Sequence, residues 1–286
     1  MIIDFHTHTF PEKIAAKALG KLAGLGDTTP FTNGMLPGLQ SSMKDNGVDL
    51  AVLMPVATAP KQHETINRVA IGTNEKWQET GIMSFGGIHP ENDNYKEIIN
   101  NLANHGIKGI KLHPVFQNID IDDEKFLRII SYACEKGLYV MTHAGYDISY
   151  PGITHASVKK IKHMLDQVAP DKMILAHMGG WSEWDEVEEL LTEYPIWMDT
   201  ATCLTTIVHR EKDLSKRKFS PEEEQMENDR FLRIVHKLGA ERFLMGSDSP
   251  WTPQGESIAV IRDNDGLTDK EKEMILGGNA KSILGL

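Results

Sequence analysis

Short runs of apolar residues alternate along the chain with longer segments in which polar and apolar positions mix at helical spacing. Eight of the runs predict strands, because they stay apolar up to their last positions, as strands buried on both faces of a parallel sheet do. The predicted strands are Ile2–His8, Leu50–Val56, Met83–His89, Gly109–Val115, Leu138–His143, Met173–His177, Ile196–Thr200 and Phe243–Asp248.

Amphipathic helices are predicted between the strands, most clearly at Asp123–Glu135, Ser157–Gln167, Ser182–Thr192 and Glu222–Leu238. Strand and helix therefore alternate, which indicates parallel strands joined by crossover helices. Eight such units in 286 residues favour an α/β fold of the (β/α)8 TIM barrel type over an open sheet. We expect residues 1–286 to form one domain, extended by long loops after strands 1 and 7 at Thr9–Gly47 and around His209–Lys218.

The composition, 40% hydrophobic and 25% charged, is typical of a globular enzyme. The formal net charge of -11 argues against nucleic acid or an anionic membrane as a partner. No apolar run approaches the roughly 20 residues of a membrane span, the chain enters a strand at once, and Cys134 and Cys203 are too few for a disulfide framework. These features predict a cytoplasmic protein.

Residues of metal-ligand type stand where the predicted strands end. His6 and His8 are two apart on one strand, so their imidazoles point the same way, about 7 Å apart along the strand. His143, His177 and Asp248 each end a later apolar run. Because the active site of a (β/α)8 barrel lies at the C-terminal rim of its strands, we expect His6, His8, His143 and Asp248 to hold a metal there.

The sequence lacks the common nucleotide-binding motifs. No Gly-rich dinucleotide fingerprint follows a predicted strand, and no phosphate-binding loop with Gly-Lys-Ser/Thr is present. A nucleotide cofactor is therefore not expected.

Several segments, in order along the chain, resemble those of a known family. They are Ile3-Asp4-Phe5-His6-Thr7-His8, Gly87-Ile88-His89-Pro90-Glu91, Gly109-Ile110-Lys111-Leu112-His113-Pro114, Thr142-His143, Ala176-His177-Met178-Gly179-Gly180, Gly246-Ser247-Asp248-Ser249-Pro250 and Ile275-Leu276-Gly277-Gly278-Asn279-Ala280. Together they identify the chain as similar to the amidohydrolase superfamily, in the amidohydrolase 2 branch. That branch includes aminocarboxymuconate semialdehyde decarboxylase, aromatic acid decarboxylases and dicarboxylate lactone hydrolases.

The resemblance implies roles for these residues. His6, His8 and His143 would bind one divalent metal as neutral imidazoles, and Asp248 would bind it or hold its water. A site of nitrogen and oxygen ligands suits Zn2+ first, and also Mn2+ or Fe2+. His177 would polarise the water or a substrate carbonyl, and Asp248 would act as general base and later as acid.

Lys111 has three interpretations. In binuclear members of the superfamily a lysine at the end of strand 4 is carbamylated and bridges two metals. Lys111 could do this, could anchor a substrate carboxylate as a cation, or could be a structural lysine at the rim. We expect a single metal and an unmodified amine. His113 shares its strand parity and could also face the pocket.

Further residues are expected to line a substrate pocket, because aromatic walls with a few polar groups are usual for small-molecule sites. They are Lys111, His113, His89, Tyr146, Trp181, Arg210 and Trp251. Arg210 could reach a substrate carboxylate, although its charged stretch also fits a solvated face. Trp184 is expected to pack in the outer helical layer.

The predicted function is that of a metal-dependent hydrolase, acting through a metal-activated water on a small, carboxylated amide, lactone or ester. The alternative is a non-oxidative decarboxylase of an aromatic or unsaturated carboxylic acid on the same metal site. A metal-stabilised protein without turnover is a third option, because fold does not fix function. Expected partners are a small-molecule substrate and, through the long rim loops, a second copy in a homodimer.

Overall fold

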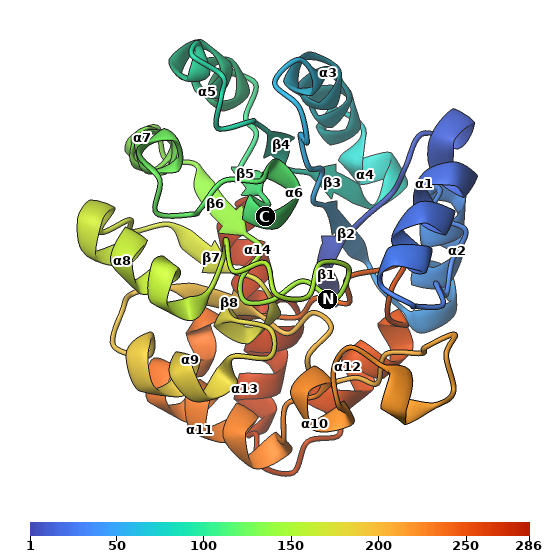
Figure 1. Ribbon diagram of the computed structural model, residues 1–286. Helices are drawn as coiled ribbons and strands as arrows, with labels where there is room; N and C mark the ends of the chain where they lie inside the picture. Colours follow the sequence, from blue (N-terminus) through green and yellow to red (C-terminus); the bar gives the residue numbers. More distant parts are fainter.

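The computed structural model describes residues 1–286 and has the predicted (β/α)8 barrel, with strands at the centre and helices around them (Figure 1). The third strand is interrupted at Phe85, whose N–H donates to the carbonyl of Leu53 (3.0 Å), so β3 and β4 together form one stave of the barrel. The strands are β1 Ile3–Thr7, β2 Leu50–Leu53, β3 Ile82–Ser84, β4 Gly86–Gly87, β5 Gly109–Leu112, β6 Tyr139–Thr142, β7 Met173–Leu175, β8 Trp197–Asp199 and β9 Phe243–Leu244.

All neighbouring strands are parallel and follow one another in sequence order, from β1 to β3 and from β4 to β9. Backbone hydrogen bonds join the last stave to the first, from Phe5 N to Met245 O (2.9 Å) and from Asp248 N to His6 O (2.8 Å). The strands are shorter than predicted. Asp248 lies beyond the end of β9 but remains attached to β1 by this bond.

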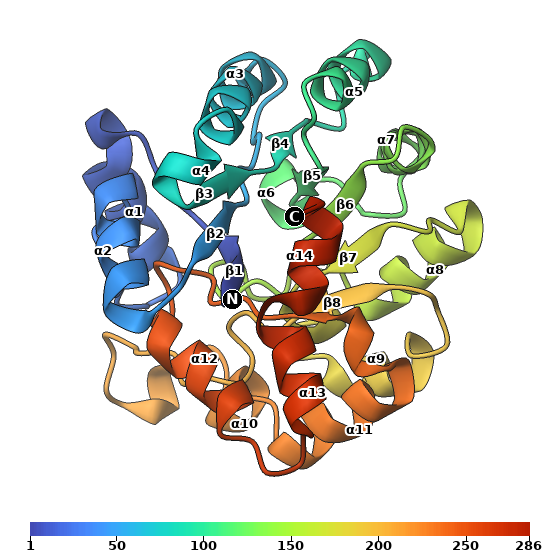
Figure 2. The same cartoon turned by 180° about the vertical axis from the view of Figure 1, so that it is seen from behind.

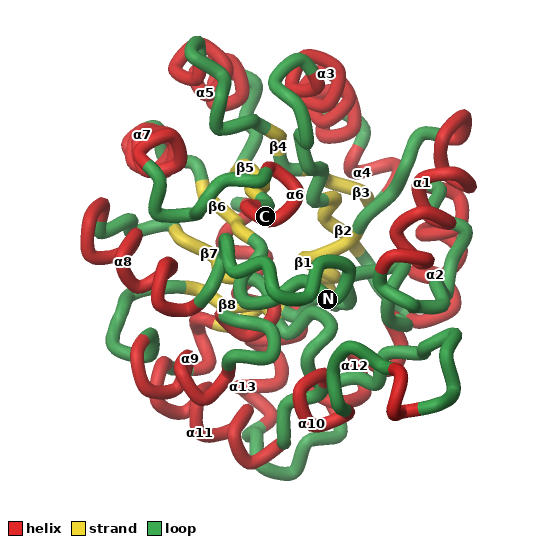
Figure 3. The backbone as a smooth tube through the Cα atoms, viewed as in Figure 1, coloured by secondary structure: helices red, strands yellow, loops and turns green.

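The helices surround the strands (Figure 3). They are α1 Glu12–Leu25, α2 Leu36–Asn46, α3 Gln62–Asn74, α4 Trp77–Thr80, α5 Tyr95–Asn104, α6 Pro114–Gln117, α7 Glu124–Glu135, α8 Val158–Val168, α9 Trp184–Leu190, α10 Pro221–Glu224, α11 Asn228–Leu238, α12 Gln254–Arg262, α13 Asp269–Glu273 and α14 Asn279–Leu284. None of them is long and apolar enough to cross a membrane.

One predicted helix, Glu222–Leu238, is in fact two, α10 and α11. The chain leaves the first helix after Glu224, and the N–H of Met226 donates to the carbonyl of Cys203 (2.8 Å) instead of to a helical partner. The residues Ser220 and Glu223 form a capping box that starts α10.

The last helix, α14, closes one end of the barrel. Its residues Ala280, Ile283 and Leu284 pack in one buried cluster with strand residues from the barrel interior, among them Phe5 and Ile174. Seen from behind, α14 lies over the centre of the strand ring (Figure 2). The opposite end, where the strands run out into loops, is left for a site.

Candidate active site

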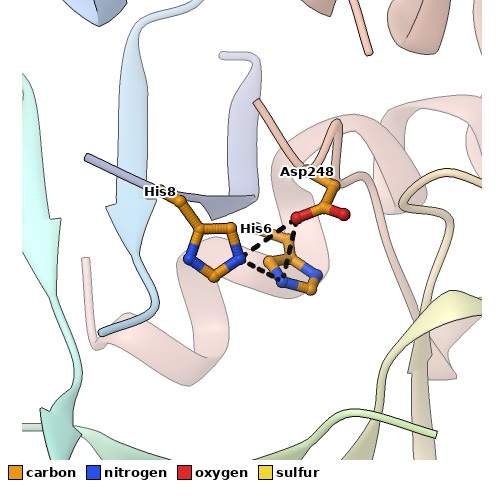
Figure 4. A group of neighbouring side chains, drawn as sticks. All are labelled: His6, His8 and Asp248. Carbon is orange, nitrogen blue, oxygen red and sulfur yellow. Dashed lines mark hydrogen bonds and ion pairs between the residues drawn. The ribbon is translucent and has the colours of Figure 1, made fainter. Parts of the chain in front are cut away.

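Three side chains of metal-ligand type meet at the open end of the barrel: His6 on β1, His8 directly after β1, and Asp248 in the loop after β9 (Figure 4). His8 Nε2 lies 3.1 Å from His6 Nε2 and 3.1 Å from Asp248 Oδ1, and His6 Nε2 lies 3.6 Å from the same oxygen. We call these three residues the ligand trio. They come from the first and last staves, which only a closed barrel brings together.

A bulge in β1 aims His6 at this point. Asp4 pairs with Ala51 and Thr7 with Leu53, so three residues of advance along β1 lie opposite two along β2. The side chain of Asp4 accepts hydrogen bonds from Ser247 N (2.9 Å) and thereby ties β1 to the loop that carries Asp248. Asp248 itself has a φ of 57°, a left-handed conformation that the surrounding structure must hold in place.

The partner of His6 Nδ1 shows which ring nitrogen of His6 offers a lone pair to His8 and Asp248. His6 Nδ1 lies 2.7 Å from Asp199 Oδ2 at the end of β8. An ionised carboxylate only accepts hydrogen bonds, so Nδ1 carries the proton, and in the neutral ring Nε2 presents a lone pair to His8 and Asp248. The other oxygen of Asp199 accepts the N–H of His177 (2.7 Å) and of Ala201 (3.0 Å). Asp199 is therefore fixed by donors on both sides.

His143 and His177 repeat this arrangement. His143 Nε2 lies 3.0 Å from the carbonyl of Tyr146, and His177 Nδ1 lies 2.9 Å from the carbonyl of Ala201. A carbonyl oxygen only accepts, so these nitrogens carry the ring protons. The remaining nitrogens, His143 Nδ1 and His177 Nε2, face each other 3.1 Å apart. Two neutral rings would set two lone pairs against each other there, a contact that a proton or a cation relieves.

These geometries fit a divalent metal. His6, His143 and His177 each donate one ring N–H to a fixed carboxylate or carbonyl and turn the other nitrogen inward, which is how metal-binding histidines are oriented in proteins. The donors are imidazole nitrogens and a carboxylate oxygen, a set that suits Zn2+, Mn2+ or Fe2+. His143 is not part of the trio itself. It lies beside His177 and groups with His113 and Asp147.

Burial favours the neutral form of three imidazoles in the site. It lowers the pKa of His6, His113 and His143 well below 6.5, and neighbouring positive groups lower it further. Burial raises the pKa of Asp248, but the neighbouring His6, His8 and His177 side chains, among them the hydrogen-bonded His8, lower it more, so this pKa lies below its usual range. His6 and His143 thus offer neutral nitrogen donors beside an ionised Asp248, the protonation states that metal binding needs.

Lys111 lies inside the site and not at its rim. Its Nζ donates to His6 Nε2 (3.2 Å), and its side chain is almost fully buried. Burial lowers the pKa of Lys111 to about 8, against the opposing pull of Asp199 and Asp248. This placement does not support the interpretation as a structural rim lysine. A carbamylated bridge and a cation for a substrate carboxylate both stay open, and the single metal with an unmodified amine stays a prediction.

A cavity of about 1100 Å3 opens over these groups. Most of the sequence-predicted site residues line it: His6, His8, Lys111, His113, His143, Tyr146, His177, Trp181, Asp248 and Trp251. Two of them do not. His89 turns its Nδ1 to the N–H of Glu91 (3.2 Å), and Arg210 is exposed, with its backbone N–H on the carbonyl of Asp27. Neither residue lines the cavity, and their role as substrate contacts stays a prediction.

Trp184 behaves as predicted. It begins α9, is buried in the main apolar core and donates its Nε1–H to the carbonyl of His177 (3.1 Å). Its contact with the backbone of a site residue makes it a support for the site from outside the cavity.

Sequence reasoning missed Asp199, Thr202 and Asp147. Thr202 donates its hydroxyl to Asp248 Oδ2 (3.0 Å), and Asp147 Oδ2 lies 3.5 Å from His113 Nε2. A signal existed for Asp199, because it is the last residue but one of the predicted strand Ile196–Thr200, close to where the other ligand-type residues stand on theirs. Thr202 and Asp147 lie in loops, where no periodicity indicates the direction of a side chain.

Comparison with known proteins places this site in a family. The profile of the family described as amidohydrolase, Amidohydro_2, matches residues 3–286, and the chain belongs to that family of metal-dependent enzymes. No curated protein matches the chain.

Solved structures share the fold over nearly the whole chain. An uncharacterised TIM-barrel protein from Bordetella bronchiseptica has a TM-score of 0.71 at 16% identity and covers 99% of this chain and 98% of its own. A 5-carboxyvanillate decarboxylase from Sphingomonas paucimobilis has a TM-score of 0.64 at 16% identity, covering 100% and 99%. A probable 2-pyrone-4,6-dicarboxylic acid hydrolase from Acinetobacter baumannii, with citric acid bound, has a TM-score of 0.63 at 14% identity, covering 100% and 99%. At these identities the likeness shows a TIM barrel, and the named enzymes include both a decarboxylase and a hydrolase.

Proposed function

We propose that the protein is a metal-dependent hydrolase that acts on a small, carboxylated amide, lactone or ester. The observation that carries the proposal is the ligand trio, which lines the same cavity as two further inward-turned imidazoles, those of His143 and His177. A divalent metal bound there, with zinc as our first choice, would polarise substrate oxygens and lower the pKa of a water toward about 7.

The protein's own groups supply the proton transfers. Asp248 is ionised. The hydroxyl of Thr202 donates to its Oδ2 only, and its Oδ1 faces His6 and His8. Asp248 would take the proton of the attacking water and pass it to the leaving group. His177 keeps a lone pair on Nε2 while its Nδ1–H is fixed on a carbonyl, so Nε2 can accept a proton and, once protonated, donate it to a carbonyl oxygen of the substrate.

Decarboxylation of an aromatic or unsaturated acid is a second candidate, and the position of Lys111 favours it. A cationic amine 3.2 Å from His6 Nε2 is well placed to hold a carboxylate against the metal-binding side chains. The largely apolar cavity would then disfavour the charged carboxylate relative to neutral CO2. On this alternative, Asp248 and His177 would deliver a proton to carbon.

Isotopes separate the two reactions. Zinc- or manganese-loaded protein would be incubated with lactones, amides, esters and aromatic or unsaturated acids, once in H2-18O and once in D2O. The proposal predicts a carboxylate product that contains 18O and no release of CO2. Release of CO2, with deuterium on the carbon that lost it and no 18O in the product, would replace hydrolysis by decarboxylation. No turnover of any compound by protein that retains its metal would contradict both.

A further inference from the structure

The cavity is much larger than the reacting end of a small acid needs. Its volume is about 1100 Å3, whereas sites for drug-sized ligands span roughly 300–1000 Å3. From the ligand trio it continues sideways, between α1 and α2 on one side and α3 on the other. In Figure 1 these helices stand on either side of β2. A carboxylate or ester group held at the trio would leave this extension empty.

The walls of the extension are mostly apolar, with Thr65 and Thr73 of α3 as polar members. Ile14, Ala18 and Leu22 are four residues apart on α1 and therefore lie on one face of the helix. Ile66 and Val69, three apart, form the facing wall on α3, and Leu36 at the start of α2 completes it. We call these six residues the apolar arm. Helix faces of this kind normally pack against another surface, and here they line open space instead.

Polar groups of the extension do not select a polar ligand. Glu12, Lys61 and Gln62 are exposed and therefore remain in contact with water. The buried hydroxyl of Ser84 is already used, because it donates to the carbonyl of Phe85 (2.8 Å). At the outer edge Ile14 and Val69 are 50% and 57% exposed, so the arm opens to solvent between two apolar side chains. Such an exposed apolar edge is typical of a binding groove.

We propose that the apolar arm binds an aliphatic chain of the substrate while the carboxyl or acyl group of the same molecule reacts at the ligand trio. The substrate class is then a carboxylic acid, or its ester or amide, with an unbranched or lightly branched hydrocarbon chain. This inference rests on the proposed function. The continuity of the arm with the metal-binding side chains in one cavity favours a substrate chain over a separate protein partner.

A chain-length series tests the inference. Binding of acetate, butyrate, hexanoate, octanoate and decanoate to zinc-loaded protein would be measured by calorimetry, with the zinc content determined on the same samples. Each buried methylene should raise the affinity by about fourfold. Octanoate should therefore bind on the order of 100-fold more tightly than butyrate.

Two pairs of variants locate the effect. Ala18→Trp fills the arm, and Ala16→Trp puts the same side chain on an exposed position of the same helix outside the cavity. Val69→Asp places a charge at the edge of the arm, and Val208→Asp does so at an exposed valine elsewhere. The octanoate-to-butyrate affinity ratio should fall at least about tenfold in Ala18→Trp and Val69→Asp. It should stay within about twofold of wild type in the two controls.

The experiment distinguishes failure of the apolar arm as a substrate site from failure of the proposed function. If the short acids bind in a zinc-dependent way but affinity does not grow with chain length, the apolar arm is not a substrate site and the proposed function stands. The same holds if the growth is equal in Ala18→Trp and Ala16→Trp. If no acid binds in a zinc-dependent way, the proposed function fails, and the inference fails with it.

Discussion

Replacing Asp199 by asparagine should weaken metal binding although Asp199 is not a member of the ligand trio. All three of its polar neighbours are donors: His6 Nδ1–H on one oxygen, and the N–H groups of His177 and Ala201 on the other. Asparagine has one accepting oxygen and one donating NH2 group. If the oxygen faces the two backbone N–H groups, the NH2 faces His6 Nδ1 and favours the tautomer with the proton on Nε2. A proton on Nε2 takes up the lone pair that otherwise faces His8 and Asp248 and could bind the metal.

The size of the effect follows from this switch. A polar partner that fixes the tautomer of a metal-binding histidine is worth about 10–100-fold in metal affinity. A loss of that size is roughly 1.4–2.7 kcal/mol of binding free energy. The Asp199 Oδ2 contact with His6 is short, at 2.7 Å, and both residues are fully buried, so water cannot replace the carboxylate. We therefore expect Asp199→Asn to lie toward the upper end of this range.

The assay is competition for zinc against a chromophoric chelator at pH 7.5, with circular dichroism to establish that the variant is folded. Asp263→Asn is the matched control, because Asp263 is a surface carboxylate paired with Arg262. Its zinc affinity should equal that of wild type. A folded Asp199→Asn protein that binds zinc within about twofold of wild type would refute the assignment of the His6 tautomer and with it the inward lone pair.

Other predictions concern chemistry and stability. His177→Asn should keep the metal and the fold but lose at least about 100-fold in turnover, measured by steady-state kinetics on metal-assayed samples, and near wild-type turnover would remove His177 from the mechanism. Lys111→Ala should act chiefly on substrate affinity, so a loss confined to kcat would contradict its role as a carboxylate anchor. Burial raises the pKa of Glu183 to about 7 from 4.5, so between these pH values the unfolded chain releases a proton that the folded protein keeps, and stability falls as pH rises. Glu183→Gln should therefore be about 1 kcal/mol more stable than wild type in urea near pH 8, allowing for the partial exposure of this side chain, and no more stable below pH 4, whereas an equal gain at both pH values would contradict this.

The chemistry at the strand ends could be predicted from local pattern, because the period of two along a strand and the geometry of a closed barrel fix where His6 and His8 point. Asp199 obeys the same pattern and was overlooked, since an aspartate at a strand end also occurs at ordinary turns. Periodicity could not indicate that His89 and Arg210 lie outside the cavity lining. The path of a loop in space depends on contacts distant in sequence, such as the bond from Arg210 N to Asp27 O.

The apolar arm could not be predicted for a related reason. Periodicity indicates that α1 and α3 each have an apolar face, but it does not say whether another surface covers that face. The same limit applies to the split between α10 and α11, which depends on the contact of Met226 with Cys203. The description of residues 1–286 as one domain stays a prediction.

The central claim is that the trio of His6, His8 and Asp248 holds a metal. Elemental analysis of protein produced and purified with excess zinc or manganese tests it most directly, with His6→Ala as the disrupting variant. His89→Ala is its control, because His89 is a buried histidine outside the cavity. We predict about one divalent metal per chain in wild type and in His89→Ala, and little or none in His6→Ala. Wild-type protein that stays metal-free, or His6→Ala protein with undiminished metal, would contradict the account.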